Sequence, residues 1–415
     1  MMMSKRRNKD VDDDAWAELH IDLLRAVGKH VDHYDDYIRM RAVCKEWELK
    51  LPKYPKHLKN LWVGFVYEGN PFYSVGEEKL YPSKMVEGVR NKVVRGSYGD
   101  WLVTIGISDG EIEMLNPFTR AQVSGLLPPV STVPEIILYD PENHNKEYTV
   151  KERIHEIGDG YHTAVWPQAW MHKSYFTKIV LSSAPQQDEV LMAGAMILYG
   201  TFGRLAYCQI GGSDKWVDIG SNNSAKPIYR DAIFHGPGNK KMMIYAVNTF
   251  VEICVIDPES GNVVSKATPP IGVRDYYHPL LNYMYVVHTP QHSVILVVRH
   301  VEGYQTTKFD IFKRIDDDTS NNEGWSRVND LGDYVLMLGL NSSACLLPHG
   351  FPDTKGNRIY YTNDKMRFET RFNDYDIGYF SVKDGTAHQI VPCSVRTSLH
   401  SDLVPPFPFW VLYNH

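Results

Sequence analysis

The sequence predicts a mainly β protein with a small all-α module near its N-terminus. Three observations predict this fold class. Helical periodicity is confined to residues 16–47, short apolar runs bounded by Gly, Pro, Asn and Asp follow from about residue 61, and one turn motif occurs twice in the β-rich part. The 415 residues leave room for one small module and one large domain.

The first predicted helix carries an apolar stripe. Leu23, Val27 and Val31 recur in steps of four residues, and Leu24 follows Ile21 after three. A module this short does not hide all of these side chains by itself, which favours docking on a partner. The alternative is an ordinary helical hairpin that packs on its own domain.

A second helix is predicted from Met40, Val43 and Trp47, which fall at i, i+3 and i+7. We expect Asp35 or Asp36 to be its N-cap, because an Asp side chain accepts hydrogen bonds from the free N–H groups of a first helical turn. Trp47 either contacts a partner or belongs to the core of the module itself.

The module holds a set of residues in a familiar order and spacing: Leu19, Asp22, Leu23, Leu24, Val27, Val31, Arg39, Val43, Cys44, Lys45 and Trp47. This pattern resembles an F-box, and its Arg-Ala-Val-Cys-Lys-x-Trp ending resembles plant members. His20 departs from the family, which usually has Pro there to pre-set the helix start.

The resemblance implies that residues 15–55 form an F-box that binds a Skp-type adaptor, and through it the cullin and RING subunits of a ubiquitin ligase. The residues that it assigns to adaptor binding are Leu19, Asp22, Leu23, Leu24, Val27, Val31, Val43, Cys44 and Trp47.

Composition argues against several classes of protein. The net charge of −6 and the pI of about 6.3 give no basic field for nucleic acid. No apolar run reaches the roughly 18 residues of a membrane span, and no signal-peptide core opens the sequence. We expect a cytoplasmic or nuclear protein without nucleic-acid or membrane partners. Residues 1–14 are expected to be a disordered tail, with a weak nuclear signal as the alternative.

The β-rich region contains an internal repeat. Residues 115–129 and 256–270 share Asn/Asp-Pro, Val-Ser and Pro-Pro at one constant offset of 141 residues, which is three times 47. A blade of a β-propeller has about 40–50 residues, so residues 61–415 are predicted to form a propeller of six or seven blades. A weaker echo relates Trp216 to Trp325. The apolar segment 408–413 is predicted to pair with residues 61–65 and close the ring.

Several segments of this region extend the family resemblance: 178–183, 205–208, 214–216, 331–334, 339–343 and 355–364. They resemble plant F-box proteins with a KIB-type (kink-suppressor-like) propeller. The resemblance implies the substrate-recognition subunit of a Skp–cullin–F-box ubiquitin ligase, in which the propeller binds an unknown target protein. The alternatives are an adaptor-binding protein with a non-degradative or competitor role, and a small-ligand-binding propeller.

Signals for catalysis or cofactors are weak. Residues 106–110 match Gly-x-Ser-x-Gly, but Asp109-Gly110 favours a β-hairpin over a nucleophile elbow. His278, His288 and His292 are a remote candidate for a metal site. The five cysteines lie far apart without a Cys-x-x-Cys pair and are expected to be small buried apolar side chains. We expect no catalytic residue, cofactor or metal.

One segment rich in aromatic residues is a candidate target-binding loop. His162, Trp166, Trp170 and Tyr175 lie close together in sequence, and Trp and Tyr dominate binding hot spots. The alternative is a long connection between blades whose Trp side chains plug the propeller.

For the adaptor-binding stripe, Leu23→Asp combined with Leu24→Asp is expected to abolish adaptor capture in a pull-down and to leave the propeller folded. Capture at the wild-type level would show that the stripe is wrongly assigned.

Overall fold

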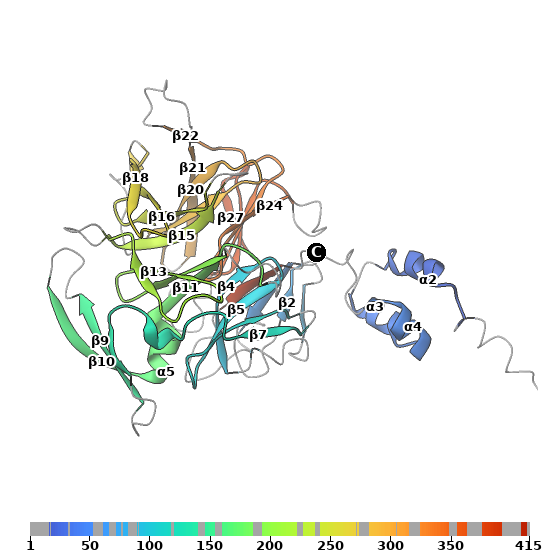
Figure 1. The fold of residues 1–415 in the computed structure, drawn as a ribbon. Coiled ribbons are helices and arrows are strands. Elements are labelled where there is room, and N and C mark those ends of the chain that lie inside the picture. The colour runs from blue at the N-terminus through green and yellow to red at the C-terminus, as the bar shows by residue number, and fades with distance from the viewer. Residues whose placement is uncertain are drawn as a thin grey trace, which may run out of the picture.

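The structure is a computed structural model. It describes residues 16, 18–31, 34–52, 61–65, 72–75, 78–81, 89, 91–117, 120–139, 146–153, 160–185, 193–221, 227–236, 241–270, 272–273, 282–303, 305–314, 324–347, 355–362, 376–391 and 408–412. The predicted tail, residues 1–14, lies outside these. The described part is mainly β with a small helical module, which confirms the predicted fold class (Figure 1).

The described part of the N-terminal module includes helices α2 (Ile21–Gly28), α3 (Tyr34–Arg41) and α4 (Lys45–Lys50). The predicted second helix is divided because Cys44 is extended, with φ of −154°, and becomes the N-cap of α4. The N-cap prediction was wrong, since α3 already begins at Tyr34 and includes both Asp35 and Asp36. Asp36 instead accepts a hydrogen bond from Arg39 at 2.9 Å.

This module has a core of its own. Leu24, Tyr37, Met40, Trp47 and Leu51 are buried against one another. The Trp47 indole N–H donates to the carbonyl oxygen of Trp16 at 2.8 Å, and the Tyr37 hydroxyl donates to that of Pro52 at 2.8 Å. The three helices are therefore held by packing and by side-chain hydrogen bonds to both flanking segments.

The β region forms six sheets of four or five strands among the described residues, and we call these sheets blades 1 to 6. In hydrogen-bonded order, blade 1 is β28 (Pro408–Leu412), β1 (Leu61–Phe65), β2 (Phe72–Ser74) and β3 (Lys79–Tyr81). Blade 2 is β4 (Lys92–Tyr98), β5 (Trp101–Gly106), β6 (Ile112–Leu115) and β7 (Gln122–Ser124). Blade 3 is β11 (Phe176–Leu181), β12 (Gly194–Tyr199), β13 (Arg204–Gln209) and β14 (Val217–Ile219).

Blade 4 is β15 (Tyr229–His235), β16 (Met243–Asn248), β17 (Ile253–Ile256) and β18 (Val263–Ala267). Blade 5 is β19 (Asn282–His288), β20 (Val294–Glu302), β21 (Gln305–Arg314) and β22 (Trp325–Arg327). Blade 6 is β24 (Ala344–Leu346), β23 (Val335–Leu338), β25 (Arg358–Tyr361), β26 (Gly378–Ser381) and β27 (Thr386–Gln389), with β23 parallel to β25.

A three-stranded sheet stands between blades 2 and 3, and we call it the inserted sheet. Its hydrogen-bonded order is β10 (Tyr161–Pro167), β9 (Glu147–Arg153) and β8 (Ile136–Tyr139). A short 3₁₀ turn (Val130–Thr132) precedes it. The short helix α5 (Gln168–Trp170) and a π-helical turn (Met171–Tyr175) follow it and lead into blade 3.

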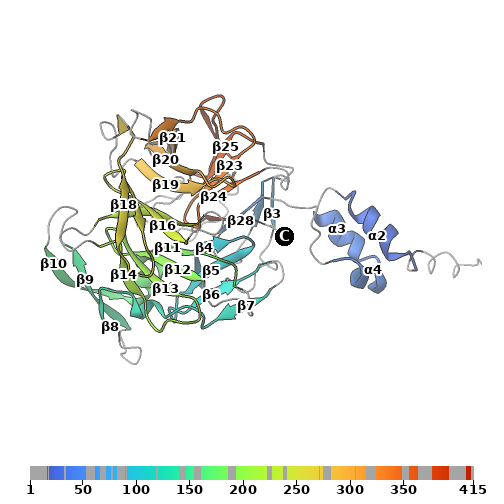
Figure 2. The same ribbon diagram turned by 45° about the horizontal axis from the view of Figure 1, so that its top comes forward.

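The blades are arranged around a common centre (Figure 2). Their first strands contact one another in order, β4 with β11, β11 with β15, β15 with β19, and β19 with β24. Burial follows position within a blade. Strand β12 is buried along its whole length, whereas β27, the last strand of blade 6, is exposed along its whole length. The apolar core therefore lies between the inner strands. No described helix has the length and apolar character that crossing a membrane requires.

The predicted ring closure is confirmed. Strands β28 and β1 pair antiparallel, with Leu61 opposite Leu412 and Phe65 opposite Pro408. Trp410 is buried against Val63 and the neighbouring residues of blade 6, and its indole N–H donates to the Leu338 carbonyl oxygen at 2.9 Å. One sheet thus joins the two ends of the β region.

The internal repeat marks equivalent hairpins, although its spacing was misread. Asn116-Pro117 and Asp257-Pro258 both turn the third strand of a blade into the fourth, and both turns have the same pair of backbone hydrogen bonds. They lie in blades 2 and 4. The offset of 141 residues therefore spans two blades and the inserted sheet rather than three blades.

The two Trp residues of the weaker echo have one shared role. The Trp216 indole donates to the Pro128 carbonyl oxygen at 3.0 Å, and the Trp325 indole donates to that of Thr268 at 2.6 Å. Each acceptor lies at one of the two Pro-Pro segments that leave a preceding sheet. The Trp residues of the echo are thus the donors, and the segments at the end of the repeat carry the acceptors, of the same kind of contact between neighbouring sheets.

A polar segment connects the blades at their centre. Residues 341–343 come directly before β24. The Asn341 side chain donates to the Trp410 carbonyl oxygen of blade 1 and to the Ser97 hydroxyl of blade 2, both at 3.0 Å. Ser342 accepts from the backbone N–H of Ser97 at 3.3 Å. We call residues 341–343 the central segment.

The same segment reaches the other blades through a buried ion pair. Lys178 of blade 3 lies 2.7 Å from Asp231 of blade 4, and both side chains are buried. Asp231 also accepts from the Ser343 hydroxyl at 2.8 Å and from the backbone N–H of Val286 in blade 5 at 3.1 Å. Every blade therefore contributes a hydrogen bond to this network.

We expect Asp231→Ala to lower the free energy of unfolding by about 3–5 kcal/mol, because it leaves the Lys178 cation buried without its partner. Urea unfolding followed by Trp fluorescence measures the change. The control is Glu259→Ala, which removes the exposed ion pair with Lys241 (2.7 Å) and should leave the midpoint almost unchanged. Equal losses in both variants would contradict the role given to the buried pair.

Candidate functional site

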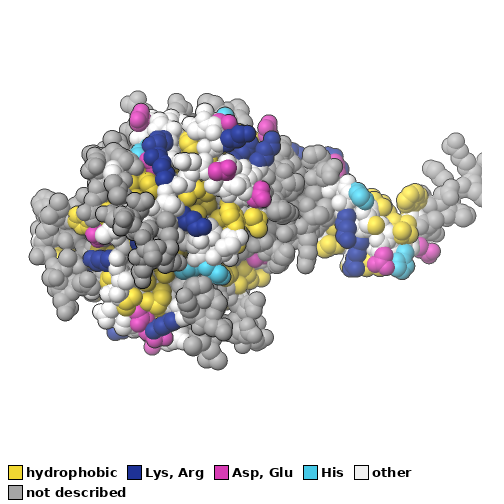
Figure 3. Space-filling view, turned by 90° about the horizontal axis from the view of Figure 1, so that it is seen from above, with side chains coloured by type: hydrophobic (Ala, Val, Ile, Leu, Met, Phe, Trp, Pro, Cys, Tyr) yellow, Lys and Arg dark blue, Asp and Glu magenta, His cyan; other side chains and the backbone are white. Residues whose placement is uncertain are grey.

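The helical module divides the predicted adaptor-binding residues into two sets. Leu24 has an exposed fraction of 0% and, with Trp47, forms the core of the module. Leu23 and Val27 are 59% and 53% exposed, and Val43 is also exposed. Asp22 is exposed, whereas Leu19, Val31 and Cys44 are half-buried against the core. Only the exposed set is available to a partner, and Figure 3 shows apolar side chains on the surface of this module.

Two further exposed apolar side chains were not predicted. Leu49 and Trp16 are both largely exposed. Leu49 comes two residues after the buried Trp47 in α4, which turns it to another side of the helix. That spacing was readable in the sequence once α4 was recognised as a helix of its own. We call Leu23, Val27, Val43 and Leu49 the apolar docking set.

His20 takes over the start of α2. Its Nδ1 atom accepts a hydrogen bond from the backbone N–H of Asp22 at 3.4 Å, which is the contact of an N-cap. The F-box resemblance would place Pro here. The helix therefore begins at the expected residue with a side-chain cap in place of a fixed φ angle.

The four predicted target-binding residues come together at the inserted sheet. The Trp166 and Trp170 rings stack, with centroids 4.2 Å apart and planes 20° from parallel. The Trp166 indole donates to Glu152 Oε1 at 2.9 Å, and His162 Nε2 lies 3.9 Å from Glu152 Oε2. Tyr175 is 2% exposed and lies in the π-helical turn beside them. Two of these side chains thus contact a buried carboxylate that sequence reasoning did not identify.

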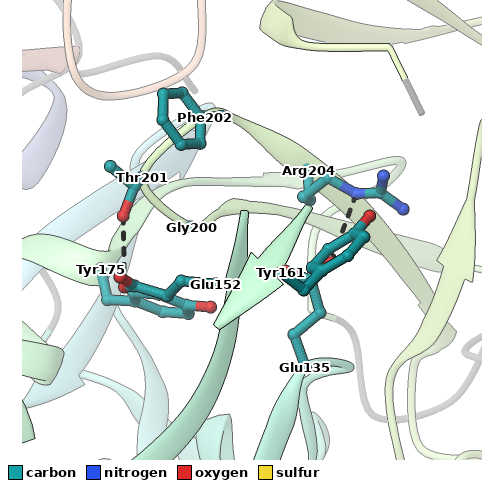
Figure 4. Close-up of a pocket in the computed structure, with 8 residues that line it drawn as sticks. All are labelled: Glu135, Glu152, Tyr161, Tyr175, Gly200, Thr201, Phe202 and Arg204. Atoms are coloured by element: carbon teal, nitrogen blue, oxygen red, sulfur yellow. Dashed lines mark hydrogen bonds and ion pairs between the residues drawn. The ribbon is translucent and has the colours of Figure 1, made fainter. Parts of the chain in front are cut away.

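A pocket opens between the inserted sheet and blade 3 (Figure 4). Its lining residues are Glu135, Glu152, Tyr161, Tyr175, Gly200, Thr201, Phe202 and Arg204. The cavity of about 20 Å³ holds one small polar group and is too small for a cofactor. Its residues come from five separate stretches of sequence, so no local sequence motif predicts the pocket.

The charges of the pocket are mostly acidic. Arg204 donates to both oxygens of Asp218 at 2.8 and 2.9 Å and lies 3.9 Å from Glu135. Burial acts to lower the pKa of the Arg204 guanidinium, but Asp218 outweighs it, and the pKa is raised. Arg204 therefore remains a cation, neutralised mainly from the Asp218 side.

Tyr175 contributes a neutral hydroxyl to this pocket. Burial, reinforced by Glu135 and Glu152, raises the pKa of Tyr175 far above its ordinary value, so the hydroxyl stays protonated at physiological pH. Within the described part of the chain, this buried hydroxyl has no hydrogen-bond partner.

The outer face of the inserted sheet carries an apolar row. Leu138 of β8 and Val165 of β10 are exposed, and both lie opposite Thr149 of β9, so they form one row across the sheet. Ile137, beside a register shift in β8, is exposed as well. The inserted sheet therefore contributes both to a polar pocket and to an exposed apolar row.

The predicted hairpin at residues 106–110 is present. The Gly110 N–H donates to the Gly106 carbonyl oxygen at 2.9 Å, and β6 follows directly where a nucleophile elbow would need a helix. His288 and His292 both lie near His235, with ring centroids 5.4 and 5.8 Å from it, while His278 lies outside the described residues. Among the residues that the structure describes, no group of three His, Cys, Asp or Glu side chains is placed to hold a metal ion.

The cysteines follow the prediction in part. Cys208 and Cys254 are buried, Cys44 and Cys345 are half-buried, and Cys393 lies outside the described residues. Burial raises the pKa of the Cys208 and Cys345 thiols to about 12, so both remain protonated at neutral pH. Neither thiol has the thiolate character of a nucleophile.

The family model of the KIB1-4 β-propeller matches residues 72–381, from β2 to β26. The chain belongs to the KIB1-4 β-propeller family. It is also 22% identical over 337 residues to an Arabidopsis thaliana protein named "Putative F-box protein At2g33200", with 78% of each chain covered.

Two solved structures show distant likenesses. The allergen Mala s 1 of Malassezia sympodialis is 9% identical with a TM-score of 0.25, and the match covers 78% of this chain and 91% of the allergen. Hsv2 of Kluyveromyces lactis is 8% identical with a TM-score of 0.23, and the match covers 62% of this chain and 90% of Hsv2. TM-scores this low support no conclusion about fold or function.

Leu23 and Leu24 are neighbours with opposite roles, which makes them a matched pair. We expect Leu24→Ala to destabilise the helical module by about 2–5 kcal/mol through the cavity that it leaves, and Leu23→Ala to change it by less than about 0.5 kcal/mol. Amide hydrogen exchange of residues 18–52 in the full chain measures both. Similar exchange in the two variants would contradict the division into core and exposed sets. It also follows that only Leu23→Asp tests docking, whereas Leu24→Asp tests folding.

Proposed function

We propose that this chain is the substrate-recognition subunit of a Skp–cullin–F-box ubiquitin ligase. The observation that supports this most is the helical module itself, which completes its own core around Leu24 and Trp47 and yet exposes Leu23, Val27 and Val43. A module with a satisfied core has no internal use for these side chains. The spacing of its residues resembles an F-box, and the relative from Arabidopsis thaliana has F-box protein in its name.

The exposed set is chemically suited to binding an adaptor. Burying one Leu or Val side chain contributes roughly 1.5–3 kcal/mol. Association costs an estimated 4–15 kcal/mol, so the four side chains of the apolar docking set offset this cost only if most of them are buried together. Loss of a single member is therefore expected to weaken binding strongly.

The propeller supplies the second half of the proposed activity. A target protein bound at the inserted sheet is held close to the charged ubiquitin carrier that the adaptor, cullin and RING subunits recruit. Ubiquitin transfer then gains from effective concentration, and this chain provides no nucleophile. We place this activity in the cytoplasm or nucleus.

We expect the full chain to bind a plant Skp-type adaptor with sub-micromolar affinity in calorimetry, and Val27→Asp to weaken binding at least tenfold, because a carboxylate is then buried in an apolar interface. The matched control is Val264→Asp on β18, since Val264 is 56% exposed and Val27 53%. No adaptor binding by the wild-type chain, or equal binding by the two variants, would refute the proposal.

Ubiquitination separates a receptor from a competitor. In cell extracts supplied with adaptor, cullin and RING subunits, proteins captured by the wild-type chain should become ubiquitinated, and Val27→Asp should abolish that modification. Adaptor binding without any dependent ubiquitination would contradict the receptor role and favour a competitor.

A further inference from the structure

We propose that the pocket between the inserted sheet and blade 3 binds a basic side chain, an arginine or a lysine, presented by the target protein. The pocket is lined by the Glu135 and Glu152 carboxylates, the Tyr161 and Phe202 rings, the Tyr175 hydroxyl and the Arg204 guanidinium, with Gly200 and Thr201 (Figure 4). This inference rests on the proposed receptor role only in naming a target protein as the source of the side chain.

Glu152 is a buried, oriented carboxylate that can accept further hydrogen bonds. Its side chain is 8% exposed, and its Oε1 atom accepts from the Trp166 indole at 2.9 Å and from the Thr201 hydroxyl at 3.2 Å. A carboxylate has about four acceptor positions. The Oε2 atom has His162 at 3.9 Å, beyond hydrogen-bond length. The two bonds at Oε1 fix the orientation of the group, and Oε2 remains able to accept from a cation.

Tyr175 indicates that the pocket is incomplete as it stands. Its hydroxyl is buried and has no partner among the described residues. It lies beside the lining residue Gly200, where a Cβ atom would come within 3.7 Å of its oxygen. Leaving a buried hydroxyl unpaired costs about 1–3 kcal/mol, and a donor entering the pocket recovers that energy because the oxygen accepts.

The charged side chains in and beside the pocket carry a net negative charge, which favours a cationic ligand. The three carboxylates of Glu135, Glu152 and Asp218 outnumber the two neighbouring cations, Arg204 and Lys151. Arg204 is bound through its Nη2 atom to both oxygens of Asp218, and its buried Nη1 atom has no hydrogen-bond partner among the described residues. The Lys151 ammonium lies 4.8 Å from the centre of the Tyr161 ring, so one face of this ring already contacts a cation.

The surroundings favour a side chain over a free ion. The apolar row of Leu138 and Val165 lies on the outer face of the inserted sheet, whereas Glu152, three residues after Thr149 in β9, lies on the opposite face, so a polypeptide that packs on the row reaches the pocket around the edge of the sheet. The cavity has room for one head group only. A single guanidinium or ammonium on a flexible stem satisfies both conditions.

The first test uses n-butylguanidinium as the probe, with neutral butyramide as its comparison, in saturation-transfer NMR with the full chain. We expect saturable binding of the guanidinium alone, and Glu152→Gln should weaken it about tenfold, the loss of one charge-assisted hydrogen bond. The control is Glu302→Gln at the exposed end of β20, which should bind as the wild type does.

A second variant guards against loss of the fold. Tyr175→Phe removes only the unpaired hydroxyl, so it should unfold at the wild-type temperature or above, and yet bind n-butylguanidinium about threefold more weakly. No saturable binding by the wild type, equal binding of butyramide, or unchanged affinity in both pocket variants would each overturn the inference.

Failure of this inference is distinguishable from failure of the receptor role. Both pocket variants should bind the Skp-type adaptor with wild-type affinity, because the pocket lies in the propeller and the apolar docking set in the helical module. Guanidinium binding without adaptor binding would refute the receptor role and leave the pocket intact. The reverse result would refute the pocket alone.

Discussion

The propeller depends on one constraint, which is that six blades must meet at a centre where none of them can pair with the next as a continuous sheet. Here the first strands are connected by polar contacts to the central segment, residues 341–343, and to the Lys178–Asp231 ion pair. A buried ion pair is costly unless hydrogen bonds satisfy its remaining atoms. The contacts of Asp231 with Ser343 and Val286 meet that condition, so the same atoms that neutralise the charge also fix the blades relative to one another.

The contacts between the outer parts of neighbouring sheets use a recurring Trp side chain instead. The Trp216 indole donates to the carbonyl oxygen of Pro128, in the first Pro-Pro segment, and the Trp325 indole donates to that of Thr268, directly before the second. The contacts at the centre differ from blade to blade, whereas the Trp-to-carbonyl contact at the outer strands occurs twice. Neither kind of contact involves the inserted sheet, which lies, with its pocket and apolar row, in the long connection between blades 2 and 3.

Much of the architecture was predictable because it follows from local sequence patterns, such as apolar runs and turn motifs. The closing strand was visible as an apolar segment at residues 408–413, and the hairpins of blades 2 and 4 as a repeat. The inserted sheet was missed because its length is close to that of a blade, so the spacing of 141 residues divided evenly by three. Likewise, periodicity placed Leu23 and Leu24 on one stripe, but only the packing of Tyr37 and Trp47 decides which of the two is core. The pocket was out of reach, since Glu135 and Thr201 are brought together by the fold alone.

The pairing of β28 with β1 has a consequence for how the chain is made. Residues 408–412 leave the ribosome after the other described strands of the ring, while their partner, residues 61–65, is among the first of these strands to emerge. Throughout synthesis, the β1 edge that β28 will cover presents unpaired N–H and C=O groups, a template on which other chains can pair. Ring closure therefore waits until β28 has emerged, and nascent chains of this protein are candidates for chaperone protection until that strand arrives.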